Sequence, residues 1–125
     1  AIDIDERFLN YIEEKNKTLQ LPVETRLVEP DDPQLKPGEA DIVLIVDTYH
    51  HIENRPTYFA RVRENLKPGG ALVVVDFKKE EMPVGPPLEM KLDANTVVEE
   101  LKKAGYQTIT VDDTSLPYQY LIIAK

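Results

Sequence analysis

Two runs of apolar, mostly β-branched residues stand out in the hydrophobic pattern of the chain. One occupies residues 42–46 and stops abruptly at Asp47, and the other occupies residues 71–77. Both are short and lack the strict polar alternation of a strand with one wet face, which indicates strands buried on both faces. Ligands of open α/β sheets bind at the carboxyl ends of such strands. The segment DTYHHI at residues 47–52 is therefore the first candidate site.

Helical and extended periodicity alternate along the rest of the chain. Apolar stripes at helical spacing, each preceded by a residue that can cap a helix, predict helices over residues 5–18, 54–66 and 93–104. The remaining apolar runs predict strands over residues 1–4, 23–28, 106–111 and 118–124. This order favours one α/β domain over residues 1–125, with a mostly parallel sheet, helices on both faces and a C-terminal antiparallel hairpin.

Composition and charge narrow the choice of partner. The chain has 15 Lys and Arg against 23 Asp and Glu, and its net charge is −8. This balance argues against a nucleic-acid backbone or an anionic membrane surface as partner, because both need a basic face. The chain has no cysteine and no apolar run near the roughly 20 residues of a membrane span. We therefore expect a cytoplasmic protein that binds neither nucleic acid nor membrane.

Several motifs together resemble a known family. A strand ends in an acid (AIDID), an acid pair follows the next strand (EPDDPQL), and a helix ends in LKPGG before a very apolar strand. The sequence resembles the C-terminal part of a class I S-adenosylmethionine-dependent methyltransferase of the type 11 kind. The resemblance extends over essentially the whole chain, and its most specific parts are LKPGGALVVVDF and DIVLIVDTYHHI. It implies a Rossmann-like fold and methyl transfer from S-adenosylmethionine to a small-molecule acceptor.

The resemblance assigns the cofactor to residues near three strand ends. Asp3, the acid that ends the first strand, would hold the ribose hydroxyls, and Ile4 would pack on the adenine. A carboxylate suits that role because it accepts charge-assisted hydrogen bonds from both vicinal hydroxyls. Asp31 or Asp32 would meet the adenine amino group, although an acid pair before a proline is equally typical of a plain turn. Val46 would line the methionine end of the cofactor.

The same resemblance places the methyl donor and acceptor beside Asp47, Tyr49 and His50. A histidine near the acceptor could act as general base. The adjacent pair His50–His51 also suggests a metal-dependent hydrolase in which Asp47 is a further ligand. Neighbouring side chains diverge on a strand or helix, however, so two adjacent histidines rarely bind one ion, and we expect no metal site. The long connection at residues 78–92 leaves the end of a buried strand, which favours a lid over the substrate.

The chain departs from the family pattern at the cofactor loop. The glycine-rich turn that follows the family's first strand has no counterpart, because no glycine precedes Gly38. Such glycines let the backbone approach a cofactor closely. We therefore expect an N-terminally truncated domain that binds the cofactor weakly or not at all. The missing strand would also leave an apolar edge beside residues 42–46. That edge predicts a homo-oligomer and, as the alternative function, a non-catalytic α/β module that self-associates.

Overall fold

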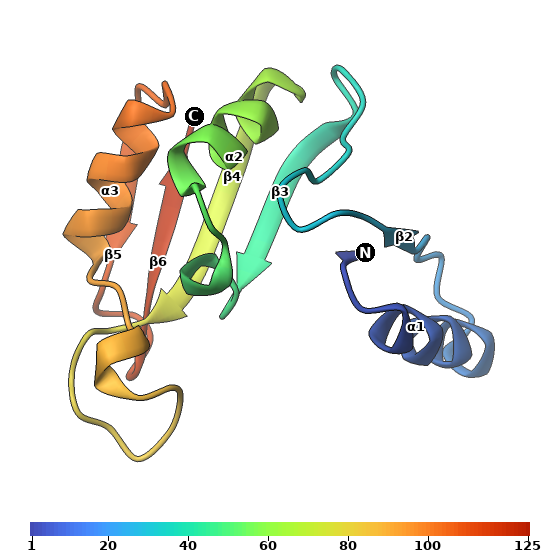
Figure 1. The fold of residues 1–125 in the computed structure, drawn as a ribbon, viewed down its shortest axis with the longest axis horizontal. Coiled ribbons are helices and arrows are strands. Elements are labelled where there is room, and N and C mark those ends of the chain that lie inside the picture. Colours follow the sequence, from blue (N-terminus) through green and yellow to red (C-terminus); the bar gives the residue numbers. More distant parts are fainter. The chain divides into compact units, whose positions relative to one another are not determined.

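Two units, Ala1–Gln34 and Leu35–Lys125, make up the structure, a computed structural model that describes all 125 residues (Figure 1). Each unit has a sheet of its own, with two strands in the first unit and four in the second. No helix of either unit is both long and apolar enough to cross a bilayer. A single domain over residues 1–125 stays a prediction.

The first unit consists of one helix and two short strands. The strands β1 (Ile2–Asp3) and β2 (Arg26–Leu27) pair in parallel, and α1 (Glu6–Leu19) lies between them in the sequence. Asp5 caps this helix as predicted, because its carboxylate accepts from the backbone N–H of Arg7 at 2.9 Å. Each strand is shorter than predicted. Only two residues of each strand are paired, Ile2 with Arg26 and Asp3 with Leu27.

The second unit contains the longer apolar strands. In chain order its elements are β3 (Ala40–Val46), η1 (Tyr49–His51), α2 (Arg55–Glu64), β4 (Leu66–Phe77), η2 (Leu88–Met90), α3 (Ala94–Lys103), β5 (Ile109–Asp112) and β6 (Gln119–Ala124). The sheet order is β3–β4–β6–β5, with β3 parallel to β4 and with β6 antiparallel to both of its neighbours. Three strands therefore run in one direction and only β6 is reversed. The predicted α/β class, with a largely parallel sheet and a terminal hairpin, is confirmed.

Helices α2 and α3 pack on one face of this sheet (Figure 1). The core on this face includes fully buried side chains from both helices and from the two middle strands: Phe59, Val62, Leu72, Val74, Val97, Leu101 and Ile122. Burial of each such side chain contributes about 1.5–3 kcal/mol. No element of this unit covers the opposite face, where Ile42 is 64% exposed and Leu44 is 62% exposed. Within this unit, helices therefore cover one face of the sheet.

Strand β4 begins earlier than the sequence indicates. The sequence predicts a turn at LKPGG and a strand from residue 71, whereas β4 starts at Leu66 and its register with β3 shifts at this point. Gly70 permits the close approach of the two strands. A Cβ atom there would lie 2.8 Å from the carbonyl oxygen of Lys67 and 2.9 Å from that of Asp41. The glycine thus lets the strand continue through a bulge where any larger residue would force the backbones apart.

Candidate active site

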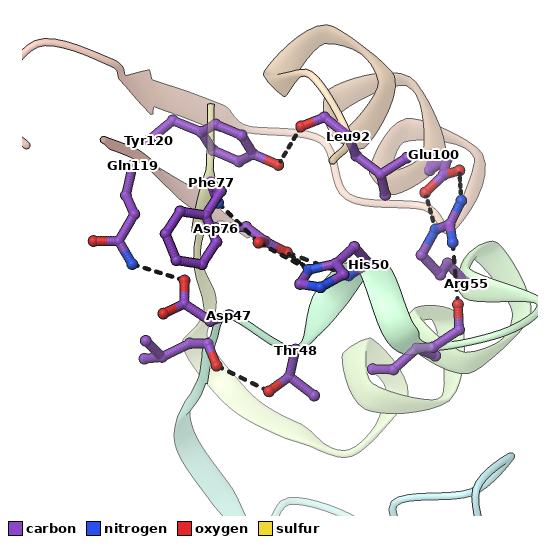
Figure 2. Close-up of polar contacts among 12 residues, drawn as sticks. Asp47, Thr48, His50, Arg55, Asp76, Phe77, Leu92, Glu100, Gln119 and Tyr120 are labelled. Atoms are coloured by element: carbon purple, nitrogen blue, oxygen red, sulfur yellow. Dashed lines mark hydrogen bonds and ion pairs between the residues drawn. The ribbon is translucent and has the colours of Figure 1, made fainter. Parts of the chain in front are cut away.

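The carboxyl ends of the neighbouring parallel strands β3 and β4 lie side by side. The backbone N–H of Asp47, directly after β3, donates to the carbonyl oxygen of Val75 in β4 at 2.8 Å. Asp76 is the last residue but one of β4, and His50 lies in η1, which follows β3. Figure 2 shows the side chains of Asp47, His50 and Asp76 around these two strand ends. This is the end of the sheet where the sequence predicts the substrate.

The imidazole of His50 is paired with the carboxylate of Asp76. Its Nδ1 lies 3.0 Å from both carboxylate oxygens, and both side chains are only 3% exposed. The same carboxylate also accepts from the backbone N–H of His50 at 3.2 Å and from that of Phe77 at 2.8 Å. A buried carboxylate is costly without such partners. Asp76 therefore ties η1 to the end of β4 through both the backbone and the ring of His50.

Asp47 lies on the other side of the same strand ends. Its backbone has a φ of 52°, which is uncommon for a residue other than glycine and is most often tolerated by Asn or Asp. Its Oδ1 accepts from Nε2 of Gln119 at 2.7 Å (Figure 2). Gln119 and Tyr120 are successive residues of β6, and Tyr120 pairs with Asp76. Successive side chains of a strand point to opposite faces, so Gln119 and Tyr120 lie on opposite faces of the sheet. Asp47 contacts Gln119, whereas His50 contacts Asp76, which lies on the same face as Tyr120. Asp47 and His50 therefore flank the strand ends from opposite faces.

Tyr49 points into the core. Its side chain is fully buried and its ring stacks on that of Phe59, with centroids 4.7 Å apart. Its hydroxyl donates to Oε2 of Glu100 at 2.9 Å, and Arg55 donates to both oxygens of the same carboxylate at 2.8 Å. Burial, reinforced by the charge of Glu100, raises the pKa of the Tyr49 hydroxyl, so this group stays protonated. These contacts give Tyr49 a structural role and separate it from His50.

A polar pocket of about 420 Å³ opens between the end of β4 and the start of α3. Charged side chains that line it are Lys78, Lys79, Glu80, Asp93 and Asp113. Tyr120 also borders the pocket, and its hydroxyl donates to the carbonyl oxygen of Leu92 at 3.1 Å. Burial first, and the charge of Asp76 second, raise the pKa of Tyr120. Tyr120 therefore lies close to Asp76 and also lines the pocket.

The residues that the sequence assigns to ribose and adenine lie in the first unit. Asp3 uses one carboxylate oxygen to accept from a backbone N–H at 2.9 Å, and its other oxygen has no partner within the chain. Ile4, beside it, is 59% exposed. A free carboxylate oxygen next to an apolar surface fits a ribose hydroxyl and an adenine ring. Asp32 accepts from the backbone N–H of Gln34 at 2.8 Å, as an acid in a turn does, and Asp31 is exposed.

The chain contains no group of three or more His, Cys, Asp or Glu side chains arranged to hold a metal ion. The rings of His50 and His51 are in contact, with centroids 4.1 Å apart. However, Nδ1 of His50 is paired with Asp76, and Asp47 accepts from Gln119. Asp47 and His50 also flank the strand ends from opposite faces, so the side chains that a metal-dependent hydrolase would need do not form one ligand set.

Two residues of this site, Asp76 and Gln119, are absent from the sequence-based prediction. Asp76 ends the apolar run ALVVVDF in the way that Asp47 ends the run IVLIVD, and this parallel could have identified it. Gln119 has no comparable signal. Its contact with Asp47 depends on β6 lying next to β4, which is a long-range pairing that local pattern does not reveal.

Comparison with known proteins identifies the family. The profile of a family described as "Methyltransferase domain" matches residues 1–74, which is more than half of the chain. Phosphoethanolamine N-methyltransferase 3 of Arabidopsis thaliana is 22% identical over 121 residues, and the match covers 90% of this chain and 25% of that protein. The chain thus spans a quarter of the length of this curated relative.

Solved structures agree with this match. A SAM-dependent methyltransferase from Aquifex aeolicus is 29% identical, with a TM-score of 0.91, and the match covers 99% of this chain and 66% of that one. Phosphoethanolamine N-methyltransferase 2 of Haemonchus contortus, solved in complex with S-adenosyl-L-methionine, shares the fold at 14% identity, with a TM-score of 0.77 over 98% of this chain and 42% of that one. The family match, the fold and the motifs together show that the chain belongs to the S-adenosylmethionine-dependent methyltransferases.

Proposed function

We propose that this methyltransferase domain transfers a methyl group to a small polar acceptor at the carboxyl ends of β3 and β4. The observation that carries the proposal is the placement of His50 there, beside Asp76, in a chain whose family uses S-adenosylmethionine. His50 would accept the proton that the acceptor loses, and Asp47 would bind the acceptor or the donor from the other face. The polar pocket bordered by Tyr120 supports an acceptor that is small and charged.

The cofactor would be held at several points. Asp3 has a carboxylate oxygen free for a ribose hydroxyl, and Ile4 offers an apolar surface for the adenine. Asp31 or Asp32 would meet the adenine amino group, and Val46, 49% exposed at the end of β3, would line the methionine end. When bound, the sulfonium group supplies an electrophilic methyl carbon. The protein contributes mainly the alignment of donor and acceptor.

We also propose that these 125 residues bind the cofactor weakly on their own. They contain no glycine-rich turn that could cradle the methionine end, since the first glycine is Gly38. Titration of the chain with S-adenosylhomocysteine tests this proposal. We expect a dissociation constant near 1 mM, or about −4 kcal/mol, because the ribose and adenine contacts remain. Isothermal titration calorimetry would show weak heats, and NMR shift changes would report the binding directly.

Asp3→Asn is the variant that tests the ribose contact. It keeps the shape of the side chain and removes the charge, so the NMR shift changes should require a higher ligand concentration. Glu6→Gln, an exposed acid in the first turn of α1, is the matched control and should titrate like the original chain. A low-micromolar dissociation constant would contradict weak binding but support the methyltransferase. Absence of any shift at millimolar ligand would contradict the proposed ribose and adenine contacts.

The methyl acceptor can be sought by testing compounds for which the relatives are named. Phosphoethanolamine is the first to test, because relatives from Arabidopsis thaliana and Haemonchus contortus are named for it. The chain would be incubated with millimolar S-adenosylmethionine and phosphoethanolamine, and the methylated amine would be measured by mass spectrometry. His50→Gln should abolish the product. An equal yield from this variant would contradict the role proposed for His50.

A second candidate function, self-association without catalysis, is favoured by the exposed edge of the second unit. β3 is the last strand of its sheet and pairs with β4 alone. Ile42, Leu44 and Val46 of this strand are 64%, 62% and 49% exposed. An apolar strand with one open edge is a template for pairing with a second copy.

Sedimentation equilibrium decides between the monomer and this self-associating form. Leu44→Lys places a charge in the middle of β3 and should convert a dimer into a monomer, because charged side chains block pairing at sheet edges. Val84→Lys, at a site 46% exposed within the long connection, is the control and should leave the mass unchanged. A monomer at every concentration would contradict self-association, and a dimer that Leu44→Lys does not dissociate would exclude β3 as the interface.

A further inference from the structure

The contact between His50 and Asp76 has a consequence for the proton on the imidazole ring. Nδ1 lies 3.0 Å from each oxygen of a carboxylate, and an ionised carboxylate can only accept hydrogen bonds. Two backbone N–H groups already donate to the same carboxylate. The proton of this contact therefore resides on Nδ1, which leaves the lone pair of a neutral ring on Nε2.

The second ring nitrogen of His50, Nε2, has no partner within the protein. All hydrogen bonds of the His50 side chain are made by Nδ1, which is turned toward Asp76 in Figure 2. Oδ1 of Asn16 is the only side-chain nitrogen or oxygen atom of the chain that is both fully buried and without a hydrogen-bond partner. Nε2 is therefore not sealed in the core, and the 3% of the side chain that is exposed includes this atom.

We propose that Asp76 is a positioning residue, which holds His50 as the Nδ1–H form and presents Nε2 as the proton acceptor. The inference rests on the proposed function for the identity of the reaction. S-adenosylmethionine, when bound, would supply the methyl group, and its sulfur would keep the electron pair of the broken carbon–sulfur bond. The acceptor's oxygen or nitrogen forms the bond to that methyl group. Its proton passes to Nε2, and the Asp76 carboxylate stabilises the imidazolium until water takes the proton from Nε2.

Position in the fold supports this assignment. Asp76 lies on β4, a central strand, with hydrogen bonds to its own strand and to η1. The carboxylate is thus fixed by the sheet, and the imidazole takes its orientation from the carboxylate. His51, the neighbouring histidine, is exposed and has no such contact. Of the two histidines, only His50 is therefore held with one nitrogen paired and the other free.

Nitrogen NMR of the chain tests the protonation site without any need for turnover. The two histidines give two imidazole patterns, and His51→Gln assigns them. Long-range ¹H–¹⁵N correlation at about pH 8.5, well above the ordinary imidazole pKa of about 6.5, distinguishes the Nδ1–H, Nε2–H and imidazolium forms. We expect His50 to be the Nδ1–H form and His51 to show the mixture of a free imidazole. An Nε2–H or imidazolium pattern for His50 would overturn the inference.

Asp76→Asn extends the test to catalysis. The amide keeps the shape of the carboxylate but can donate to Nδ1, so we expect His50 to change to the Nε2–H form. With phosphoethanolamine as acceptor, kcat should fall by about 100-fold, as for loss of a general base, with KM unchanged. Asp41→Asn, an exposed acid at the start of β3, is the control. A rise in KM at constant kcat would overturn the role of Asp76.

The outcomes separate this inference from the proposed function. If His50 is the Nδ1–H form but no acceptor is methylated, the arrangement of the pair is supported and the proposed reaction fails. If methyl transfer occurs while His50 is the Nε2–H form, the reaction is supported and the role of Asp76 fails. The spectrum of the original chain decides the protonation site even if Asp76→Asn does not fold.

Discussion

The hydrogen bonds around Glu100 provide a sharp test of the core. Glu100→Ala removes the acceptor of the Tyr49 hydroxyl and of two N–H groups of Arg55. The hydroxyl is then left unpaired in a fully buried position, which costs about 1–3 kcal/mol. Arg55 is 23% exposed and still donates to a carbonyl oxygen, so loss of its ion pair adds about 1 kcal/mol. We expect a loss of about 2–4 kcal/mol, or roughly 10 °C in Tm.

Urea denaturation followed by circular dichroism measures this loss, and two further variants make the result specific. Glu99→Ala, at the exposed neighbour in the same helix, should change the free energy of unfolding by less than about 0.5 kcal/mol. Tyr49→Phe should cost about 1 kcal/mol. In the double variant Tyr49→Phe/Glu100→Ala no hydroxyl is left unpaired, so its cost should be less than the sum of the two single costs. Additive costs would refute the reasoning.

The same carboxylate has a defined pH dependence. Burial would raise the pKa of Glu100, but hydrogen bonds from Arg55 and Tyr49 outweigh it and hold the pKa below its ordinary value. A carboxyl group whose pKa is lowered by folding adds stability above its unfolded pKa of about 4.3, and this stability is lost as the pH falls through the folded pKa. The difference between the original chain and Glu100→Ala should therefore be complete at neutral pH and shrink in acid.

Two further predictions concern the turns that flank the site. Hydrogen bonds from the hydroxyl and backbone N–H of Ser115 lower the pKa of Asp112 to about 2. Asp112→Asn should therefore lower Tm at neutral pH, and the difference from the original chain should vanish as the pH falls through about 2. An equal loss at both pH values would contradict this. Gly85 has a φ of 90°, and a Cβ there would lie 2.7 Å from the ring of Phe77, so Gly85→Ala should cost about 1–3 kcal/mol and expose residues 78–92 to limited proteolysis. Cleavage at the original rate would contradict it.

The local pattern of apolar and polar residues predicts much of this fold, because most of the helices and strands have the periodicity and capping residues typical of their type. The strand predicted from the apolar run at residues 42–46 is β3, which ends at Val46 as predicted, and the helix predicted to follow Asp93 is α3. Asp93 accepts from the backbone N–H of Thr96 at 2.7 Å, as an N-cap does. The apolar run in the second half of β4 was equally clear. The extended LKPGG segment was not, because its conformation depends on the neighbouring strand and not on its own residues.

The site was predicted less completely than the fold, and η1 explains why. A 3₁₀ helix has three residues per turn, so adjacent side chains diverge by about 120°. Tyr49 therefore enters the core while His50, the next residue, meets Asp76. The sequence places both at the end of a buried strand but contains no signal for the turn that separates them. Asp76 itself comes from a strand 26 residues away in the chain.

The position of β6 also bears on how the chain folds as it is synthesised. β6 is the last strand along the chain, yet it lies between β4 and β5 and supplies Ile122 and Tyr120 to the core. β5 has no other partner, so it cannot join the sheet before β6 has emerged from the ribosome. Until then β4 exposes the edge to which β6 will pair. The core of the second unit must therefore close after translation of its last residues, and a nascent chain stalled before Gln119 would present an open, apolar sheet to chaperones.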